Sequence, residues 1–332
     1  MIHYFVKRLF AATVTLFFVS LLIFSIVKCM PNDPVQSYLG LSSKATVEQK
    51  EQLREHLGID QPLGKQYAIW INRMIRGDFG TSLYDKKEVK ELILEKLPYS
   101  IGLYGSSLLL AVIVSSVLAV IAVIQNKRMI DQVFHIYSYV VLSLPSFFVG
   151  MIILYGFYSI GGVFIYGTSD FYYSVVGYPS IGMKIGDLLF HAFLPCLTMT
   201  VLLSASFLRY LQAHLKQEAV ELYALCAKAK GLSKWKIAWV HLYRNVLSSF
   251  LTYLASYFPI MISGCMLIEI LFEWEGLGKL LYRSLHCGDE SVMCAVLFLT
   301  AAASILGNVF FDILALKMHP LIKESYVEGD QL

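Results

Sequence analysis

Long apolar segments constrain this chain more than any other feature. Each is long enough to cross about 30 Å of hydrocarbon as a helix, which takes roughly 20 residues. The six segments are residues 9–27, 101–124, 133–160, 188–208, 246–271 and 292–316. Backbone groups in lipid must bond within the segment, and none of the six alternates like a barrel strand. The sequence therefore predicts an all-α, polytopic membrane protein with six transmembrane helices.

Basic residues in the short loops predict the orientation of these helices, because Lys and Arg mark the cytoplasmic side. They are Lys7 and Arg8 before the first segment, Lys127 and Arg128 after the second, and Lys317 and Lys323 after the sixth. Both termini are therefore predicted to be cytoplasmic. The formal net charge of +3 over 332 residues gives little support for a nucleic-acid-binding face.

The predicted organisation has four parts. They are a first transmembrane helix within 1–30, a small helical extracytoplasmic insertion over 31–97, a five-helix core over 98–318 with a cytoplasmic loop at 212–245, and a cytoplasmic tail over 319–332.

The insertion carries its own helix signals. Thr46 and Gln49 form a capping box, and Gly58 is placed to end that first helix. Further helices are predicted over 67–75 and over 89–97, where Pro98 is expected to open the second transmembrane helix.

A turn is predicted at 76–82, where Gly77 and Gly80 flank Asp78. The Arg-Gly-Asp tripeptide at 76–78 is too short to indicate an adhesion motif. An outer cap of this kind is suited equally to shielding the mouth of the helices and to receiving a delivering protein.

Motifs for catalysis and for metal binding are absent from the sequence. It contains no GxxxxGK[ST] phosphate loop, no HExxH helix and no GxSxG turn, so energy from ATP would have to come from another chain. The six cysteines fall in no CxxC or Cys/His ligand spacing. No cofactor or metal is therefore expected on this chain, and a disulfide between Cys29 and Cys287 is left open.

A basic stretch over 222–245 is the most informative polar feature. From 216 to 244 there are six Lys and Arg residues against two acids. Membrane topology alone would explain a basic loop. Ala227 and Gly231, one helical turn apart, and the His-to-Asn ending at 241–245 favour a docking element for a cytoplasmic partner.

Polar and proline residues inside the apolar segments suggest a transport path. A carboxylate such as Glu269 is costly at membrane depth and usually faces a cavity or a partner, although a solvated position near the outer end would also accommodate it. Pro145 and Pro259 mark kinks that can open a central cavity. With Ser146, these residues are the candidates for the path.

The basic stretch resembles the cytoplasmic loop of permease subunits of bacterial ABC importers, in the branch for di- and oligopeptides and nickel. That loop reads close to DYVRTARAKGL and ends in HALRNALLP, and the matching residues are Tyr223, Ala227, Lys230, Gly231, Leu232, His241, Arg244 and Asn245. Three further blocks agree, at 77–82, 144–150 and 268–281. The usual loop-closing proline is absent from 246–249.

The resemblance implies a coupling helix lodged in a groove of an ATP-binding subunit, with Ala227 and Gly231 allowing close backbone approach. It implies a second homologous permease, two ATP-binding subunits that use ATP and Mg, an extracytoplasmic solute-binding protein and a bacterial inner-membrane location. Candidates for docking the binding protein are Gly77, Asp78, Gly80, Trp274 and Gly276.

Peptides are the expected substrate, and nickel or a metal chelate is the alternative. An ATP-independent channel is a further alternative, which would have no ATP-binding partner. A membrane-embedded enzyme would need a paired nucleophile and base within the helices, and the sequence shows none, although Ser263 and His191 could be tested by substitution.

Overall fold

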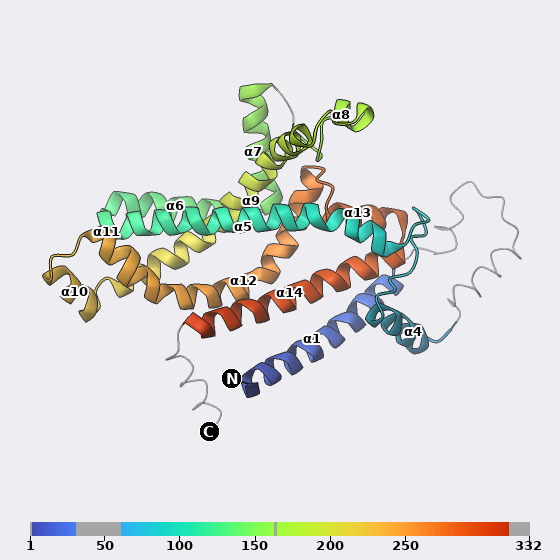
Figure 1. The fold of residues 1–332 in the computed structure, drawn as a ribbon, viewed down its shortest axis with the longest axis horizontal. Coiled ribbons are helices and arrows are strands. Elements are labelled where there is room, and N and C mark those ends of the chain that lie inside the picture. The colour runs from blue at the N-terminus through green and yellow to red at the C-terminus, as the bar shows by residue number, and fades with distance from the viewer. Residues whose placement is uncertain (1, 31–60, 163–164, 319–332) are drawn as a thin grey trace, which may run out of the picture. The chain divides into compact units, whose positions relative to one another are not determined.

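The computed structural model describes residues 2–30, 61–162 and 165–318 (Figure 1). Over these residues the regular secondary structure is helical, apart from one isolated β-bridge between Thr81 and Glu88. The all-α prediction is therefore confirmed. The predicted helix with Thr46, Gln49 and Gly58 lies outside the described residues, as does the tail over 319–332.

The chain divides into two compact units. One comprises Met1–Ser100 with Glu275–Leu306, and the other comprises Ile101–Trp274 with Gly307–Leu332. Two long helices, α5 (Val89–Gln125) and α14 (Glu290–Met318), contribute to both. The units are called the outer unit and the core unit below.

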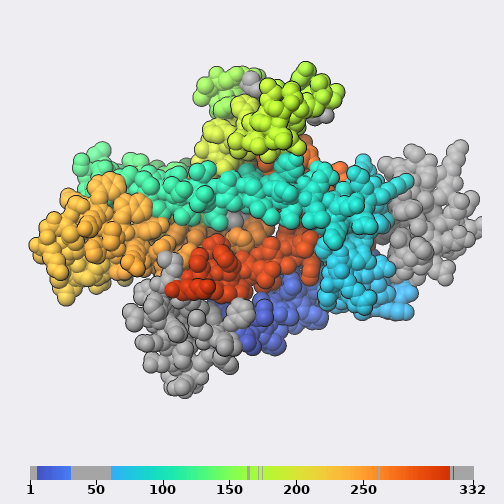
Figure 2. Space-filling view, viewed as in Figure 1, coloured from blue at the N-terminus to red at the C-terminus, as the bar shows by residue number. Residues whose placement is uncertain are grey.

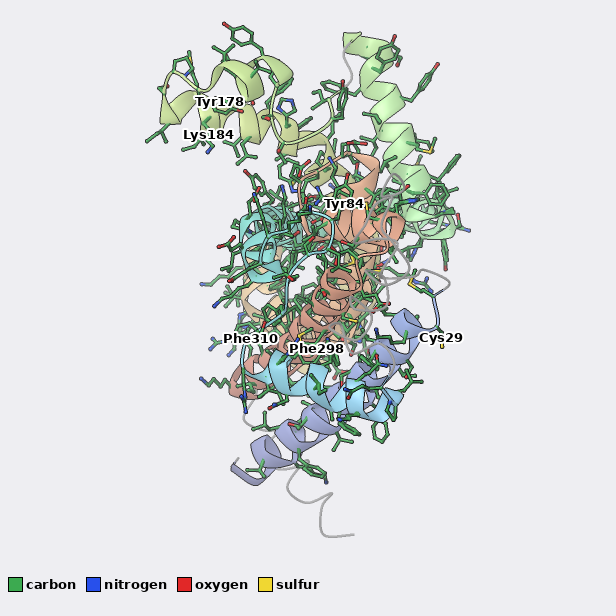
Figure 3. The ribbon with its side chains drawn as sticks, turned by 90° about the vertical axis from the view of Figure 1, so that its right-hand side faces the viewer. Cys29, Tyr84, Tyr178, Lys184, Phe298 and Phe310 are labelled. Atoms are coloured by element: carbon green, nitrogen blue, oxygen red, sulfur yellow. The ribbon has the colours of Figure 1, made fainter. Side chains whose placement is uncertain are left out.

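Aromatic packing organises the outer unit, in which α4 (Leu63–Ile75) lies beside α1 (Ile2–Lys28) (Figure 1). The rings of Phe24 and Trp70 are 5.5 Å apart, and Trp70 meets Phe298 of α14 edge to face at 6.0 Å. Phe298 is labelled in Figure 3. The helix predicted at 67–75 is thus present and begins four residues earlier, after Pro62.

Polar contacts attach the turn-containing segment before α5 to α13 (Leu277–Cys287) and to the start of α14. The buried Asp289 carboxylate accepts the Ser82 hydroxyl at 2.6 Å, and Arg283 pairs with Asp85. Cys29, at the end of α1 (Figure 3), and Cys287 are both free thiols, so the disulfide left open from the sequence is not formed.

Pro98 lies within α5, so the prediction that it separates two helices is wrong. The segment expected as a short helix over 89–97 continues directly into the second apolar segment as one helix of 37 residues. A proline removes one backbone hydrogen bond, and a long apolar helix tolerates that loss without ending.

Helices α9 and α12 form the centre of the core unit. They are α9 (Ile181–Glu218) and α12 (Tyr243–Leu271), and Phe207 of the first meets Phe250 of the second edge to face at 5.6 Å. The remaining elements are α6 (Arg128–Ser143), α7 (Ser146–Gly161), α8 (Phe171–Val176), α10 (Leu222–Ala229), α11 (Lys234–Lys236) and the π-helix η1 (Ile237–Leu242).

The third apolar segment, predicted as one helix over 133–160, is instead two helices that meet at 110°. Leu144, between them, is extended, with φ −95° and ψ 143°, and Pro145 caps α7 rather than lying inside a helix. A proline disfavours helical backbone at the residue before it, which accounts for this elbow. Pro259 lies inside α12 as expected, and that helix bends by 49° between Ile260 and Ile262.

By length and apolar composition, four helices in the described part of the chain suit a membrane span. They are Val6–Lys28, Val89–Gln125, Ile181–Glu218 and Glu290–Leu314, and the number rises to six if each bent helix pair is counted as one span.

Candidate functional site

The basic stretch forms a short helix that ends at a left-handed glycine. After α10, Gly231 takes φ +75°. The Leu232 N–H bonds to the Ala227 carbonyl at 3.3 Å, and the Gly231 N–H bonds to the Lys228 carbonyl at 3.0 Å. These two bonds are the Schellman pattern of helix termination, in which glycine adopts a positive φ at little cost. The stop expected at Gly231 is present.

The residues that α10 exposes differ from those expected. Ala227 is only 5% exposed and packs into the core unit, so the expectation that it lies at a partner surface is wrong. The outward side carries Leu222, 75% exposed, and Leu225, 49% exposed, with Cys226 and Ala229 on the same stripe. We call these four residues the α10 face. Figure 2 shows this yellow-orange segment at the surface at one end of the core unit.

One tyrosine connects α10 to the two central helices. The Tyr223 hydroxyl donates to the Glu218 carboxylate at the end of α9, and the Asn245 side chain of α12 bonds to the same hydroxyl. Burial, and then the bond to Glu218, raises the pKa of Tyr223 to about 12. The phenol is therefore neutral near pH 7 and can donate. The structure thus joins Tyr223 directly to Asn245, which the sequence named separately, and also to Glu218, which the sequence did not identify.

The remaining loop candidates lie around this junction. Lys230 and Arg244 are exposed, whereas Leu232 and His241 are half-buried, His241 within η1. At the start of α6, Asp131 accepts from Lys216 at 2.6 Å and from Gln212 at 2.8 Å. The last turns of α9 are therefore held by α6 as well as by α10.

A cavity of about 330 Å³ lies within the core unit, between the α6–α7 elbow, α9 and α12. Ser146 lines it, and Tyr257 and Ser263 add further hydroxyl groups to an otherwise apolar lining. Pro145 and Pro259 are beside lining residues without lining the cavity themselves. The sequence signal that could have identified Ser263 as a path residue is its position four residues after Pro259 in an apolar helix.

Glu269 is not among the residues that line this cavity, and it is 0% exposed. The interpretation of Glu269 as a solvated carboxylate is therefore wrong. Its backbone carbonyl accepts the Trp274 N–H at 2.8 Å, which ties the end of α12 to the turn that follows.

The described residues contain neither a catalytic nucleophile–base pair at Ser263 and His191 nor a cluster of metal ligands. The Ser263 hydroxyl donates to the Ile260 carbonyl at 2.9 Å, while the His191 ring is engaged by Asp187 of its own helix. Ser263 and His191 therefore form no nucleophile–base pair. Over the described part of the chain, no three His, Cys, Asp or Glu residues are grouped so that they could hold a metal ion.

The candidates for docking a binding protein fall into two groups. In the outer unit, the Asp78 carboxylate accepts the Gly80 N–H at 2.9 Å, and both residues line a groove of about 230 Å³ beside the turn at Gly77. By contrast, Trp274 is 3% exposed and Gly276 is buried at the start of α13. Only the first group is available at the surface.

We expect the charge cluster at Glu275 to stabilise the outer unit in a pH-dependent way. Glu275 accepts from Lys96 at 2.8 Å and from Lys279 at 2.7 Å. Burial raises the pKa of the Glu275 carboxyl, but these two bonds outweigh it and hold the pKa below the ordinary value of 4.5. The stabilisation is therefore present above pH 4.5 and is lost as the pH falls through the lower, folded value.

The measurement is the thermal unfolding midpoint of the purified chain from pH 7 to pH 3. Glu275→Gln should lower the midpoint at pH 7, and the difference from the unsubstituted chain should shrink below pH 4.5. Glu88→Gln, at an exposed position, is the control and should behave like the unsubstituted chain. A difference that stays constant with pH would contradict the assignment.

Comparison with known proteins places this arrangement in a family. Residues 108–324 match the family described as "Binding-protein-dependent transport system inner membrane component", and residues 1–104 match the N-terminal region of such components. The "Glutathione transport system permease protein GsiC" of Escherichia coli (strain K12) is 30% identical over 323 residues, covering 97% of this chain and 99% of the relative. The "Oligopeptide transport system permease protein AppB" of Bacillus subtilis (strain 168) is 29% identical over 330 residues, covering 97% and 100%.

The matches extend over both units and include the loop that forms α10. The resemblance drawn from the sequence is confirmed, and so are transport as the role and the inner membrane as the location. The chain belongs to the family of binding-protein-dependent transport system inner membrane components and is a multi-pass permease subunit of an ABC importer.

Proposed function

We propose that the chain pairs with a second, homologous permease to form a path for peptides delivered by an extracytoplasmic solute-binding protein. It crosses the membrane six times with both termini in the cytoplasm, and the α6–α7 pair counts as one crossing. Two ATP-binding subunits, which bind and hydrolyse ATP with Mg, dock at the α10 face. The names of the two relatives, for glutathione and for oligopeptides, support the peptide class.

The observation that carries this proposal is the link from the α10 face to the cavity. Tyr223 ties α10 to Glu218 and Asn245, at the ends of α9 and α12, and both of these helices line the cavity with Ser146 and Ser263. Closure of the ATP-binding subunits displaces α10, and the two helices follow. The cavity then alternates between the two sides as a population shift imposed by a partner.

The cavity chemistry favours peptides over a bare metal ion. Its hydroxyl groups come from Ser146, Tyr257 and Ser263, and none of the described lining residues is charged. Hydroxyl groups suit the neutral amides of a peptide backbone, whereas a metal ion requires carboxylate, imidazole or thiolate ligands. An ATP-independent channel would leave the α10 face without a function.

The experiment is uptake by the assembled transporter, purified with its partner chains and reconstituted in vesicles. Labelled glutathione, a labelled oligopeptide and a nickel chelate are supplied with the binding protein, with and without ATP inside the vesicles. Peptide uptake that requires ATP is expected. If only the nickel chelate were taken up, the substrate would be a metal chelate instead of a peptide. Peptide uptake without ATP would contradict the importer mechanism.

A further inference from the structure

A second cavity, of about 460 Å³, lies behind α10 in the core unit. It is separate from the cavity at the α6–α7 elbow and shares no lining residue with it. Its volume falls within the range of about 300–1,000 Å³ that is typical of small-molecule sites. Nothing in the proposed transport cycle uses it.

The floor of this cavity is apolar. Val123 and Ile124, in the last turn of α5, face Ile237 and Leu242 of η1, and both η1 side chains are almost fully buried. A floor of this kind is unfavourable to water and favours hydrocarbon. The groups expected to occupy it are therefore apolar.

The rim of the cavity is cationic. Lys228 and Lys234 line it, and none of its described lining residues is acidic. The Lys228 ammonium donates to the neutral Ala219 carbonyl at 3.3 Å, and both lysines are exposed, so each can approach an anion. The two lysines thus offer an anion two positive charges beside an apolar floor.

The position of the cavity along the chain relates it to the edge of the bilayer. Val123 and Ile124 lie in the last turn of α5, which is long and apolar enough to span a membrane, and Lys127 and Arg128 follow one residue after its end. In the proposed topology this is the cytoplasmic side, where basic residues near a helix end attract acidic lipid headgroups. This step rests on the proposed function.

We propose that the cavity binds an acidic phospholipid, with part of an acyl chain on the apolar floor and the phosphate between Lys228 and Lys234. A soluble phosphate would give the lysines an anion but leave the apolar floor uncovered. A neutral lipid would cover the floor but give the lysines no anion. The acidic phospholipid satisfies both. It braces α10 and η1 against the end of α5, so the coupling helix is supported by the membrane as well as by the protein.

The test is labelling of the full-length chain in lipid nanodiscs that contain phosphatidylcholine and a photoactivatable phosphatidylglycerol, followed by mapping of the labelled peptides. Label is expected on the peptides that carry Val123 and Ile237. The double variant Lys228→Gln/Lys234→Gln should reduce it roughly tenfold or more, since each lysine contributes to attraction of the anionic headgroup. Lys236→Gln/Lys184→Gln is the control of equal charge, because both lysines are exposed and neither lines the cavity (Lys184, Figure 3).

A second variant separates the apolar requirement from the charge. Ala219→Leu adds side-chain volume at the cavity and keeps both lysines, and the helical backbone at Ala219 accepts leucine without strain. It should lose the label while the thermal unfolding midpoint stays unchanged.

Three results would overturn the proposal. They are equal labelling of the Lys228/Lys234 variant and its control, displacement of the label by inorganic phosphate as effectively as by unlabelled phosphatidylglycerol, and displacement of the label by the ATP-binding subunits, which would make the cavity part of a protein interface. Labelling is measured without transport, so failure here is distinguishable from failure of the peptide-uptake experiment.

Discussion

Gly231→Val is expected to abolish ATP-driven uptake while leaving the chain inserted in the membrane at its normal level. Gly231 takes φ +75°, and a left-handed backbone costs about 1–2 kcal/mol for a residue with a Cβ and more for a β-branched one. Valine would break the Schellman bonds and redirect the chain from Leu232 onward. The measurement is peptide uptake in reconstituted vesicles, together with ATP hydrolysis stimulated by the loaded binding protein.

Gly231→Asn is the matched control, since asparagine tolerates the left-handed region. Among the residues that the structure describes, no atom lies within 4 Å of a Cβ placed at Gly231, so crowding does not separate the two variants and only backbone conformation does. Asparagine should retain most of the uptake. If valine and asparagine were equally active, the turn at Gly231 would have no part in coupling.

Leu225→Glu should weaken binding of the ATP-binding subunits. Leu225 lies in the α10 face, and burying a leucine side chain contributes about 1.5–3 kcal/mol, while an unpaired carboxylate in the same contact adds a penalty. A loss of this size weakens binding by roughly tenfold to a hundredfold. The measurement is titration of a purified ATP-binding subunit onto the chain in nanodiscs.

Ile181→Glu is the control for that substitution. Ile181 is an exposed apolar residue at the opposite end of α9 from α10, so it introduces the same charge away from the α10 face. The affinity of the Ile181→Glu chain for the ATP-binding subunit should match that of the unsubstituted chain. Equal loss in both variants would indicate a general effect of charge, and equal retention would move the docking site off α10.

Features that depend on local chemistry were predictable from the sequence. The helical class follows from segment length and lipid, and the stop at Gly231 follows from glycine at a helix end, with no contribution from distant residues. The helix beginning near Tyr67 likewise follows from its own apolar periodicity.

Features that depend on packing were not predictable. Pro145 ends the helical run before it, whereas α5 continues through Pro98, and a proline beside an apolar run is compatible with either outcome. The side of α10 that faces outward was also undetermined, since Ala227 and Leu225 both fit a helix between two membrane segments. Glu269 and Trp274 are both buried, and the Trp274 N–H donates to the Glu269 carbonyl across the turn between them.

The elbow between α6 and α7 governs the sidedness of everything that follows it. Each helix has 16 residues, or about 24 Å at 1.5 Å per residue, so neither alone matches about 30 Å of hydrocarbon. Counted as a return to the starting side, the pair would place Lys127 opposite Lys216 and α10, which disagrees with the 2.6 Å ion pair between Asp131, at the start of α6, and Lys216, at the end of α9. Counted as one oblique passage, it places all of these basic residues together, as the charge rule requires. In the proposed topology, the proline-induced bend thus lets two short helices make one crossing, and the chain meets its ATP-driven partner on the face that carries Lys127 and Lys216.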